Sequence, residues 1–110
     1  MSGLAERHCT PVASGTPPLN RAEAEDLLDQ LSGWSLARQG KGITKTYAFK
    51  DFVSAMGFAN TITAIAEAQQ HHPELLVSWG KVTVSLATDD IGGLSENDFI
   101  VAAKIDALNP

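Results

Sequence analysis

The chain has 110 residues, 44% of them hydrophobic, and a formal net charge of −5, which suits one domain with a single core. Its eight basic residues are scattered, whereas a nucleic-acid-binding surface needs clustered Lys and Arg, so we do not expect the protein to bind nucleic acid. It has no apolar run of membrane-spanning length, no secretory leader pattern and one cysteine, Cys9, so we expect a soluble, cytoplasmic protein that does not bind a membrane.

The N-terminal segment, residues 1–18, is rich in small polar residues and ends in two prolines. This composition predicts a flexible N-terminal arm, followed by a single domain over residues 19–110. The domain should begin with a helix capped by Asn20, because Glu23 three residues later completes a capping-box pattern. We expect this helix to end at Gly33.

Alternating apolar residues then predict two pairs of strands, separated by a long helix. That helix has Asp51 as its cap and should end near His71, because Pro73 stops it. A final helix should start after Ser95, with the carboxylate of Asp98 in its first turn. The expected strands span residues 34–39, 43–49, 75–79 and 82–88.

The resulting order, α-β-β-α-β-β-α, has hairpin connections, which imply antiparallel pairing. We therefore expect an α+β fold, in which a four-stranded antiparallel sheet has three helices packed on one face.

The most informative motif is Gln70-His71-His72-Pro73-Glu74, which places two of the three histidines at the end of the long helix. Glu67 lies four residues before His71, so these two side chains should share a helix face and interact. Two imidazoles and a carboxylate indicate a proton-transfer site, with structural capping of the helix end as the alternative. Adjacent helical residues diverge by about 100°, so we do not expect the pair to chelate a metal.

Two further positions allow two interpretations each. Trp79 is either a core residue of its strand or the wall of a flat pocket that stacks on a heteroaromatic ring. Asp89 and Asp90, which follow the last strand, form either a solvated turn or part of a site lined by loop residues.

Several motifs lie between Pro18 and Leu108, namely Gly33-Trp34, Phe49-Lys50-Asp51-Phe52, the run from Glu67 through His71-His72-Pro73 to Trp79, the segment Gly92-Gly93-Leu94-Ser95-Glu96, and Asp98. In these motifs and their spacing the chain resembles the pterin-4a-carbinolamine dehydratase family.

The resemblance implies removal of water from a 4a-hydroxytetrahydropterin to give the quinonoid dihydropterin, with no metal or organic cofactor. By resemblance, His71 is the main acid/base residue, and His72 binds and orients the pterin substrate. Asp89 stands where the family has a third active-site histidine. We expect Asp89 to act there as a base or hydrogen-bond acceptor, which would weaken the catalytic set.

The resemblance also implies residues that bind or support the substrate. Glu67 would orient His71 or contact the pterin ring, and Trp79 would lie across the pocket from the histidines. Thr88 would supply backbone contacts, and Asp98 would support the site.

Two functions are therefore compatible with the sequence. The first is a dehydratase that forms a homodimer or homotetramer, with strands pairing across subunits. The alternative is a non-catalytic, dehydratase-like Rubisco assembly factor of the alpha-carboxysome, whose partner would be the Rubisco large subunit. Retention of His71 and His72 favours the enzyme, whereas the loss of histidine at Asp89 favours the assembly factor.

Overall fold

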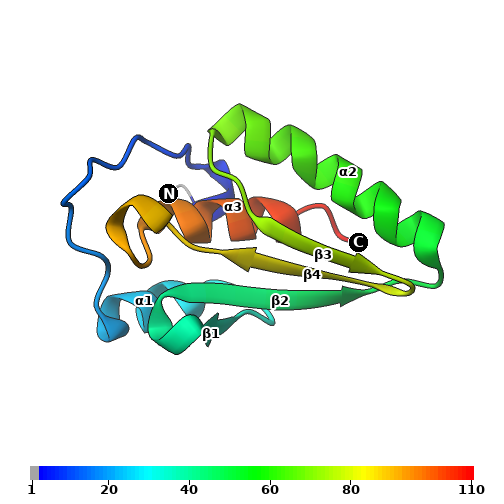
Figure 1. The fold of residues 1–110 in the computed structure, drawn as a ribbon, viewed down its shortest axis with the longest axis horizontal. Coiled ribbons are helices and arrows are strands. Elements are labelled where there is room, and N and C mark those ends of the chain that lie inside the picture. The colour runs from blue at the N-terminus through cyan, green and yellow to red at the C-terminus, as the bar shows by residue number, and fades with distance from the viewer. Residues whose placement is uncertain (1–2) are drawn as a thin grey trace.

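The structure is a computed structural model that describes residues 3–110, so residues 1 and 2 of the expected arm lie outside the described residues. Its helices and strands follow the predicted order α-β-β-α-β-β-α (Figure 1). They are α1 (Arg21–Leu28), β1 (Ser35–Ala37), β2 (Gly42–Ala48), α2 (Phe52–Gln69), β3 (Glu74–Ser78), β4 (Lys81–Leu86) and α3 (Glu96–Asp106), with short 3-10 turns η1 (Leu4–Glu6), η2 (Arg38–Gly40) and η3 (Asp89–Ile91).

The four strands form one antiparallel sheet in the order β1-β2-β4-β3, which confirms the predicted α+β fold with three helices. The long helix α2 carries the chain across the sheet from β2 to β3, so β4 can pair between these two strands (Figure 1). In the register of the central pair, Ile43 lies opposite Leu86 and Tyr47 lies opposite Val82. These side chains are buried and form the sheet's contribution to the core, as their alternation predicts.

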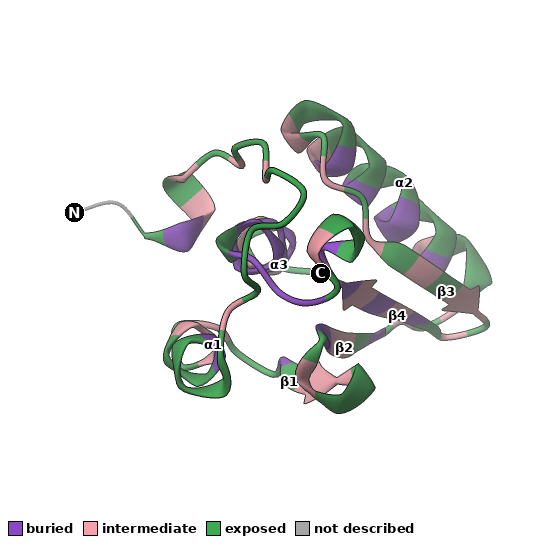
Figure 2. Cartoon of the chain, turned by 60° about the vertical axis from the view of Figure 1, so that its left-hand side comes forward, coloured by how far each residue is buried: buried purple, intermediate pink, exposed green. Residues whose placement is uncertain are grey.

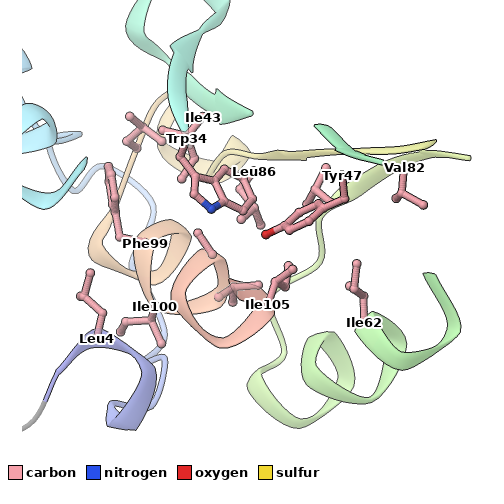
Figure 3. Packing of buried hydrophobic residues seen from close by; sticks show 14 of the residues in the cluster. Leu4, Trp34, Ile43, Tyr47, Ile62, Val82, Leu86, Phe99, Ile100 and Ile105 are labelled. Carbon is pink, nitrogen blue, oxygen red and sulfur yellow. The ribbon is translucent and has the colours of Figure 1, made fainter. Parts of the chain in front are cut away.

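Helix α3 lies at the centre of the molecule, and most of its residues are buried (Figure 2). Because its apolar residues are spread around the helix and not confined to one face, it can pack against several elements at once. Phe99 and Ile105 extend from α3 into the core, which also contains Tyr47 from β2 and Ile62 from α2 (Figure 3).

Capping residues fix where the helices begin. Asn20 and Glu23 form the predicted capping box at α1, with the Glu23 N–H donating to Asn20 at 2.8 Å and the Asn20 N–H donating to Glu23 at 2.9 Å. The prediction that this helix reaches Gly33 is wrong, because α1 ends at Leu28. Residues 30–31 bond to carbonyls three residues back, which closes the helix in a tight turn.

At α2, the predicted cap Asp51 accepts a hydrogen bond from the backbone N–H of Ser54 at 2.8 Å. This bond favours the charged carboxylate and lowers the pKa of Asp51. None of the helices in residues 3–110 combines the length and apolarity needed to cross a membrane.

Part of the N-terminal segment has defined contacts with α3. Leu4 is 4% exposed and packs in the core. Further along, Lys104 donates to the carbonyl of Ala5 at 2.8 Å, and Arg7 forms an ion pair with Glu96 at 2.6 Å. No sequence pattern predicted these contacts, because the partners lie about ninety residues apart.

Candidate active site

The end of α2 determines where the two histidines lie. The helix stops at Gln69, and Gln70 adopts a left-handed conformation with φ 51° and ψ 41°. The N–H of His71 then bonds back to the carbonyl of Ala66 at 3.2 Å, which is the six-to-one bond of a Schellman cap. The predicted helix end near His71 is therefore two residues too late, and both histidines lie in the α2–β3 connection.

His71 is bonded to Asp98 across the molecule. Its Nε2 lies 2.6 Å from Oδ1 of Asp98, and the two side chains are 12% and 0% exposed. The other oxygen of the carboxylate, Oδ2, accepts the hydroxyl of Thr88 at 2.9 Å and the backbone N–H of Ser95 at 3.0 Å. The N–H of Ser95 needs this acceptor because it lies at the start of α3, so one carboxylate both caps the helix and positions the imidazole.

These bonds fix the role of each ring nitrogen of His71. A carboxylate that already accepts two hydrogen bonds acts as an acceptor toward His71 too, so Nε2 carries the proton of that pair. Among residues 3–110, Nδ1 of His71 has no hydrogen-bond partner. The imidazole can therefore take up and release a proton at Nδ1 while Asp98 stabilises the positive charge that develops on the ring.

Glu67 pairs with His72. The expected pairing of Glu67 with His71 is not formed. Oε2 of Glu67 lies 2.6 Å from Nε2 of His72, and the two side chains are 64% and 55% exposed. The expected pairing with His71 assumed a continuous helix, whereas the left-handed Gln70 turns the chain before His71 and breaks the four-residue spacing. The histidine pair is thus divided into one imidazole bound to a buried acid and one bound to a solvent-exposed acid.

A cavity of about 470 Å³ lies beside His71. Thr88 also lines it, as does Asp90 from the turn η3, whereas Asp89 is exposed and is not among the lining residues. Several lining residues had no predicted role, namely Cys9, Thr10, Pro11, Val12, Ala68, Gln69, Gln70 and Asn97. Gln69 and Gln70 directly precede His71 in the sequence, so their place beside it could have been expected. The contribution of residues 9–12 depends on the docking of the N-terminal segment and has no signal in the sequence.

Trp79 does not lie with the other predicted site residues in this chain. It is 73% exposed in the turn after β3, whereas His71 and His72 precede the start of that strand. Five residues of extended strand separate the two ends by roughly 16 Å. The structure therefore brings together His71, Thr88 and Asp98, with the His72–Glu67 pair beside them.

Within residues 3–110, no group of three or more His, Cys, Asp or Glu side chains is arranged to hold a metal ion. The chemistry that this arrangement offers is proton transfer by an imidazole, supported by a buried carboxylate.

Comparison with known proteins shows the family to which the chain belongs. The family model described as pterin 4 alpha carbinolamine dehydratase matches residues 17–108. A protein of Azoarcus sp. (strain BH72), provisionally named a pterin-4-alpha-carbinolamine dehydratase, is 46% identical over 108 residues, which cover 98% of this chain and 92% of the relative. A similarly named protein of Dechloromonas aromatica (strain RCB) is 47% identical over 105 residues, covering 96% of this chain and 92% of the relative.

Solved structures share the fold. The transcriptional coactivator/pterin dehydratase of Brucella melitensis superimposes with a TM-score of 0.79 at 34% identity, covering 84% of this chain and 99% of its own. A pterin dehydratase-like protein identified as a RuBisCO assembly factor in the alpha-carboxysome gives a TM-score of 0.59 at 22% identity, over 69% of this chain and 88% of its own. At that identity the second likeness concerns the fold alone. The family model and the curated relatives together cover the whole domain that carries His71 and Asp98, and the chain belongs to the pterin-4a-carbinolamine dehydratase family.

Proposed function

We propose that this protein removes water from a 4a-hydroxytetrahydropterin to give the quinonoid dihydropterin. The observation that carries the proposal is the His71 imidazole beside a cavity, bonded through Nε2 to the fully buried carboxylate of Asp98. Family membership supports the class of substrate, and the cavity volume of about 470 Å³ is in the usual range for a small-molecule site.

The reaction needs two proton movements. One proton leaves N5 of the pterin, the N5 electron pair forms the double bond to C4a, and the hydroxyl on C4a departs with a proton as water. We assign both transfers to Nδ1 of His71, which accepts the N5 proton and then delivers a proton to the leaving hydroxyl. Asp98 stabilises the imidazolium that exists between the two transfers.

The remaining predicted residues have supporting roles in this proposal. His72 binds and orients the pterin, with Glu67 holding its imidazole at the outer edge of the site. Thr88 lines the cavity and contacts the substrate through its backbone, while its hydroxyl helps to hold Asp98. Asp89 is exposed, so a base or acceptor role there would require it to reach the bound substrate from outside the cavity.

The test is the rate of dehydration of a 4a-hydroxytetrahydropterin above the uncatalysed background. We expect His71→Ala to lower kcat by about a hundredfold or more, because a general acid–base residue contributes on that scale. His72→Ala is the matched comparison, and it should raise KM with a smaller loss of kcat. A wild-type rate equal to background would refute the dehydratase, and an unchanged rate in His71→Ala would move the chemistry to another residue.

The second candidate is a non-catalytic role in Rubisco assembly, with the Rubisco large subunit as partner. The observation that favours it is the exposed Asp89, which leaves His71 as the one histidine lining the cavity among residues 3–110. The rate of dehydration by the Asp89→His variant, compared with that of the wild type, distinguishes the two functions. Activity that appears only in this variant, together with binding of the large subunit by the wild type, would support assembly.

We also infer that the protein forms a homodimer or homotetramer. The edge strand β3 has no partner on its outer side within residues 3–110, and apolar surface is exposed by Leu76 within the strand and by Trp79 in the turn after it. An unpaired edge of this kind favours pairing with a second strand. Light scattering coupled to gel filtration should give a mass of two or four chains, and a monomer at micromolar concentration would refute the inference.

A further inference from the structure

The cavity beside His71 has a wall that comes from the N-terminal segment. Residues 9–12 line it together with residues from the α2–β3 connection, η3 and α3. The match to the family model starts at residue 17, so this wall lies outside the matched region. The roles proposed for His71 and Thr88 leave the contribution of this segment to the cavity unexplained.

The wall is held in place by hydrogen bonds to its backbone. Asn97 accepts the N–H of Thr10 through Oδ1 at 3.2 Å and donates through Nδ2 to the carbonyl of Thr10 at 2.7 Å. The N–H of Cys9 donates to Oε1 of Gln69 at 2.7 Å. Asn97 is only 7% exposed, and both its Oδ1 and its Nδ2 take part in these two bonds. Such a paired, buried amide fixes one register of the segment along α3.

Both anchors are directly linked to the catalytic group. Asn97 precedes Asp98, which holds the imidazole of His71, and Gln69 ends the helix two residues before His71. The two elements that position His71 therefore also position the segment. The wall and the imidazole have a fixed relation to each other, so a ligand bound next to His71 contacts the segment as well.

We propose that Asn97 is a positioning residue that holds residues 9–12 as a substrate-binding wall of the pterin cavity. The proposal rests on the proposed dehydratase function for the identity of the ligand. Pro11 and Val12 contribute apolar surface to this wall, which suits the ring face and apolar edge of a bicyclic pterin. Asn97 itself acts through the segment and need not touch the substrate.

Kinetics provide the first test. Asn97→Ala removes both bonds to Thr10, so the wall should detach and KM for the 4a-hydroxytetrahydropterin should rise by about tenfold. The His71–Asp98 pair is retained, so kcat should stay within about twofold. Lys104→Met is the matched control, because it removes a bond to the same segment at Ala5 but outside the cavity. It should leave KM and kcat unchanged.

Alkylation of Cys9 provides a test that does not depend on turnover. Cys9 is the only cysteine of the chain, and burial raises the pKa of its thiol to about 11, so modification by iodoacetamide at pH 8 should be slow. Asn97→Ala should speed this reaction by about tenfold or more, and saturating 7,8-dihydrobiopterin should slow it several-fold in the wild type. Thr10→Pro removes the Thr10 N–H without changing α3, and it replaces Asn97→Ala in this test if Asn97→Ala does not fold. It should also speed the alkylation of Cys9.

The outcomes separate this proposal from the dehydratase itself. If the wild type neither turns over nor binds a pterin, the proposed function fails, and an accelerated Cys9 reaction in Asn97→Ala then shows only that Asn97 holds the segment. If the wild type is active, and Asn97→Ala and Thr10→Pro change neither KM nor the rate of Cys9 alkylation, the positioning role is refuted. A fall in kcat with constant KM in Asn97→Ala would also refute it, because the residue would then act on the chemistry rather than on the wall.

Discussion

Nε2 of His71 lies 2.6 Å from Oδ1 of Asp98, although the two residues are 27 positions apart in the sequence. The carboxylate is completely buried and is held from its other side by Thr88 and Ser95. A charge removed from water in this way is costly unless it is hydrogen-bonded, and here three donors share the two carboxylate oxygens. The pair therefore joins the proposed acid–base residue to the start of α3.

Asp98→Asn should lower kcat by about a hundredfold, on the scale of a lost acid–base partner. The amide offers one acceptor oxygen instead of two, so either His71 or the Thr88–Ser95 pair loses its acceptor. It also carries no negative charge to stabilise the imidazolium. Steady-state kinetics with circular dichroism would check this, and a folded variant with unchanged kcat would exclude Asp98 from the mechanism.

Glu67→Gln should change kcat by less than about threefold and the free energy of unfolding by less than about 0.5 kcal/mol. Its partner is His72, and both side chains are more than half exposed, so solvent weakens the interaction between them. Parallel kinetic and urea-denaturation measurements on this variant and on Asp98→Asn provide the comparison. A loss of tenfold or more in Glu67→Gln would show that the exposed pair takes part in the chemistry.

Local patterns in the sequence were sufficient to predict most of the fold. The alternation in β4 and the capping box at Asn20 each act over a few residues, and both appear as expected. The identity of the histidine partners could not be predicted in the same way. Gln70 adopts a left-handed conformation that glycine or asparagine usually marks, so nothing in the sequence signalled the early end of α2. Because of that single residue, Glu67 meets His72 and leaves His71 to Asp98.

The wall of the cavity was unpredictable for a different reason. Asn97 binds Thr10 only through the Thr10 backbone, so the identity of Thr10 carries no trace of the contact. The segment itself is rich in small polar residues and prolines, a composition typical of a mobile arm. Contacts over 87 residues of sequence follow from the docking of whole elements and not from any local pattern.

Asp106→Ala should lower the free energy of unfolding by about 2–3 kcal/mol, because the buried donors of Trp34 and Tyr47 lose their acceptor. The carboxylate accepts Nε1 of Trp34 at 3.0 Å, Nζ of Lys45 at 2.9 Å and the hydroxyl of Tyr47. Asp26→Ala, on the exposed side of α1, is the matched control and should cost less than about 0.5 kcal/mol. Urea denaturation of both variants gives the comparison, and equal losses would show that the Asp106 network contributes no stability.

Tyr47 should make the fold sensitive to alkaline pH. Burial, and then the hydrogen bond to Asp106, raises the pKa of its phenol far above the ordinary value of 10.0. The folded state thus favours the neutral phenol, and this contribution to stability is complete below about pH 10, where the unfolded chain is also protonated. It is lost progressively as the pH rises from there toward the folded-state pKa, since only the unfolded chain then gains by ionising.

The measurement is specific because Tyr47 is the only tyrosine of the chain, so tyrosinate absorbance at 295 nm reports this residue alone. We expect no titration near pH 10 while the protein remains folded, followed by ionisation together with unfolding as monitored by circular dichroism. Tyr47→Phe is the control: it has no group to ionise, so between pH 9 and 11 its stability should fall less steeply than that of the wild type. Ionisation near pH 10 in a protein that stays folded would show that the phenol is open to solvent and is not held by Asp106.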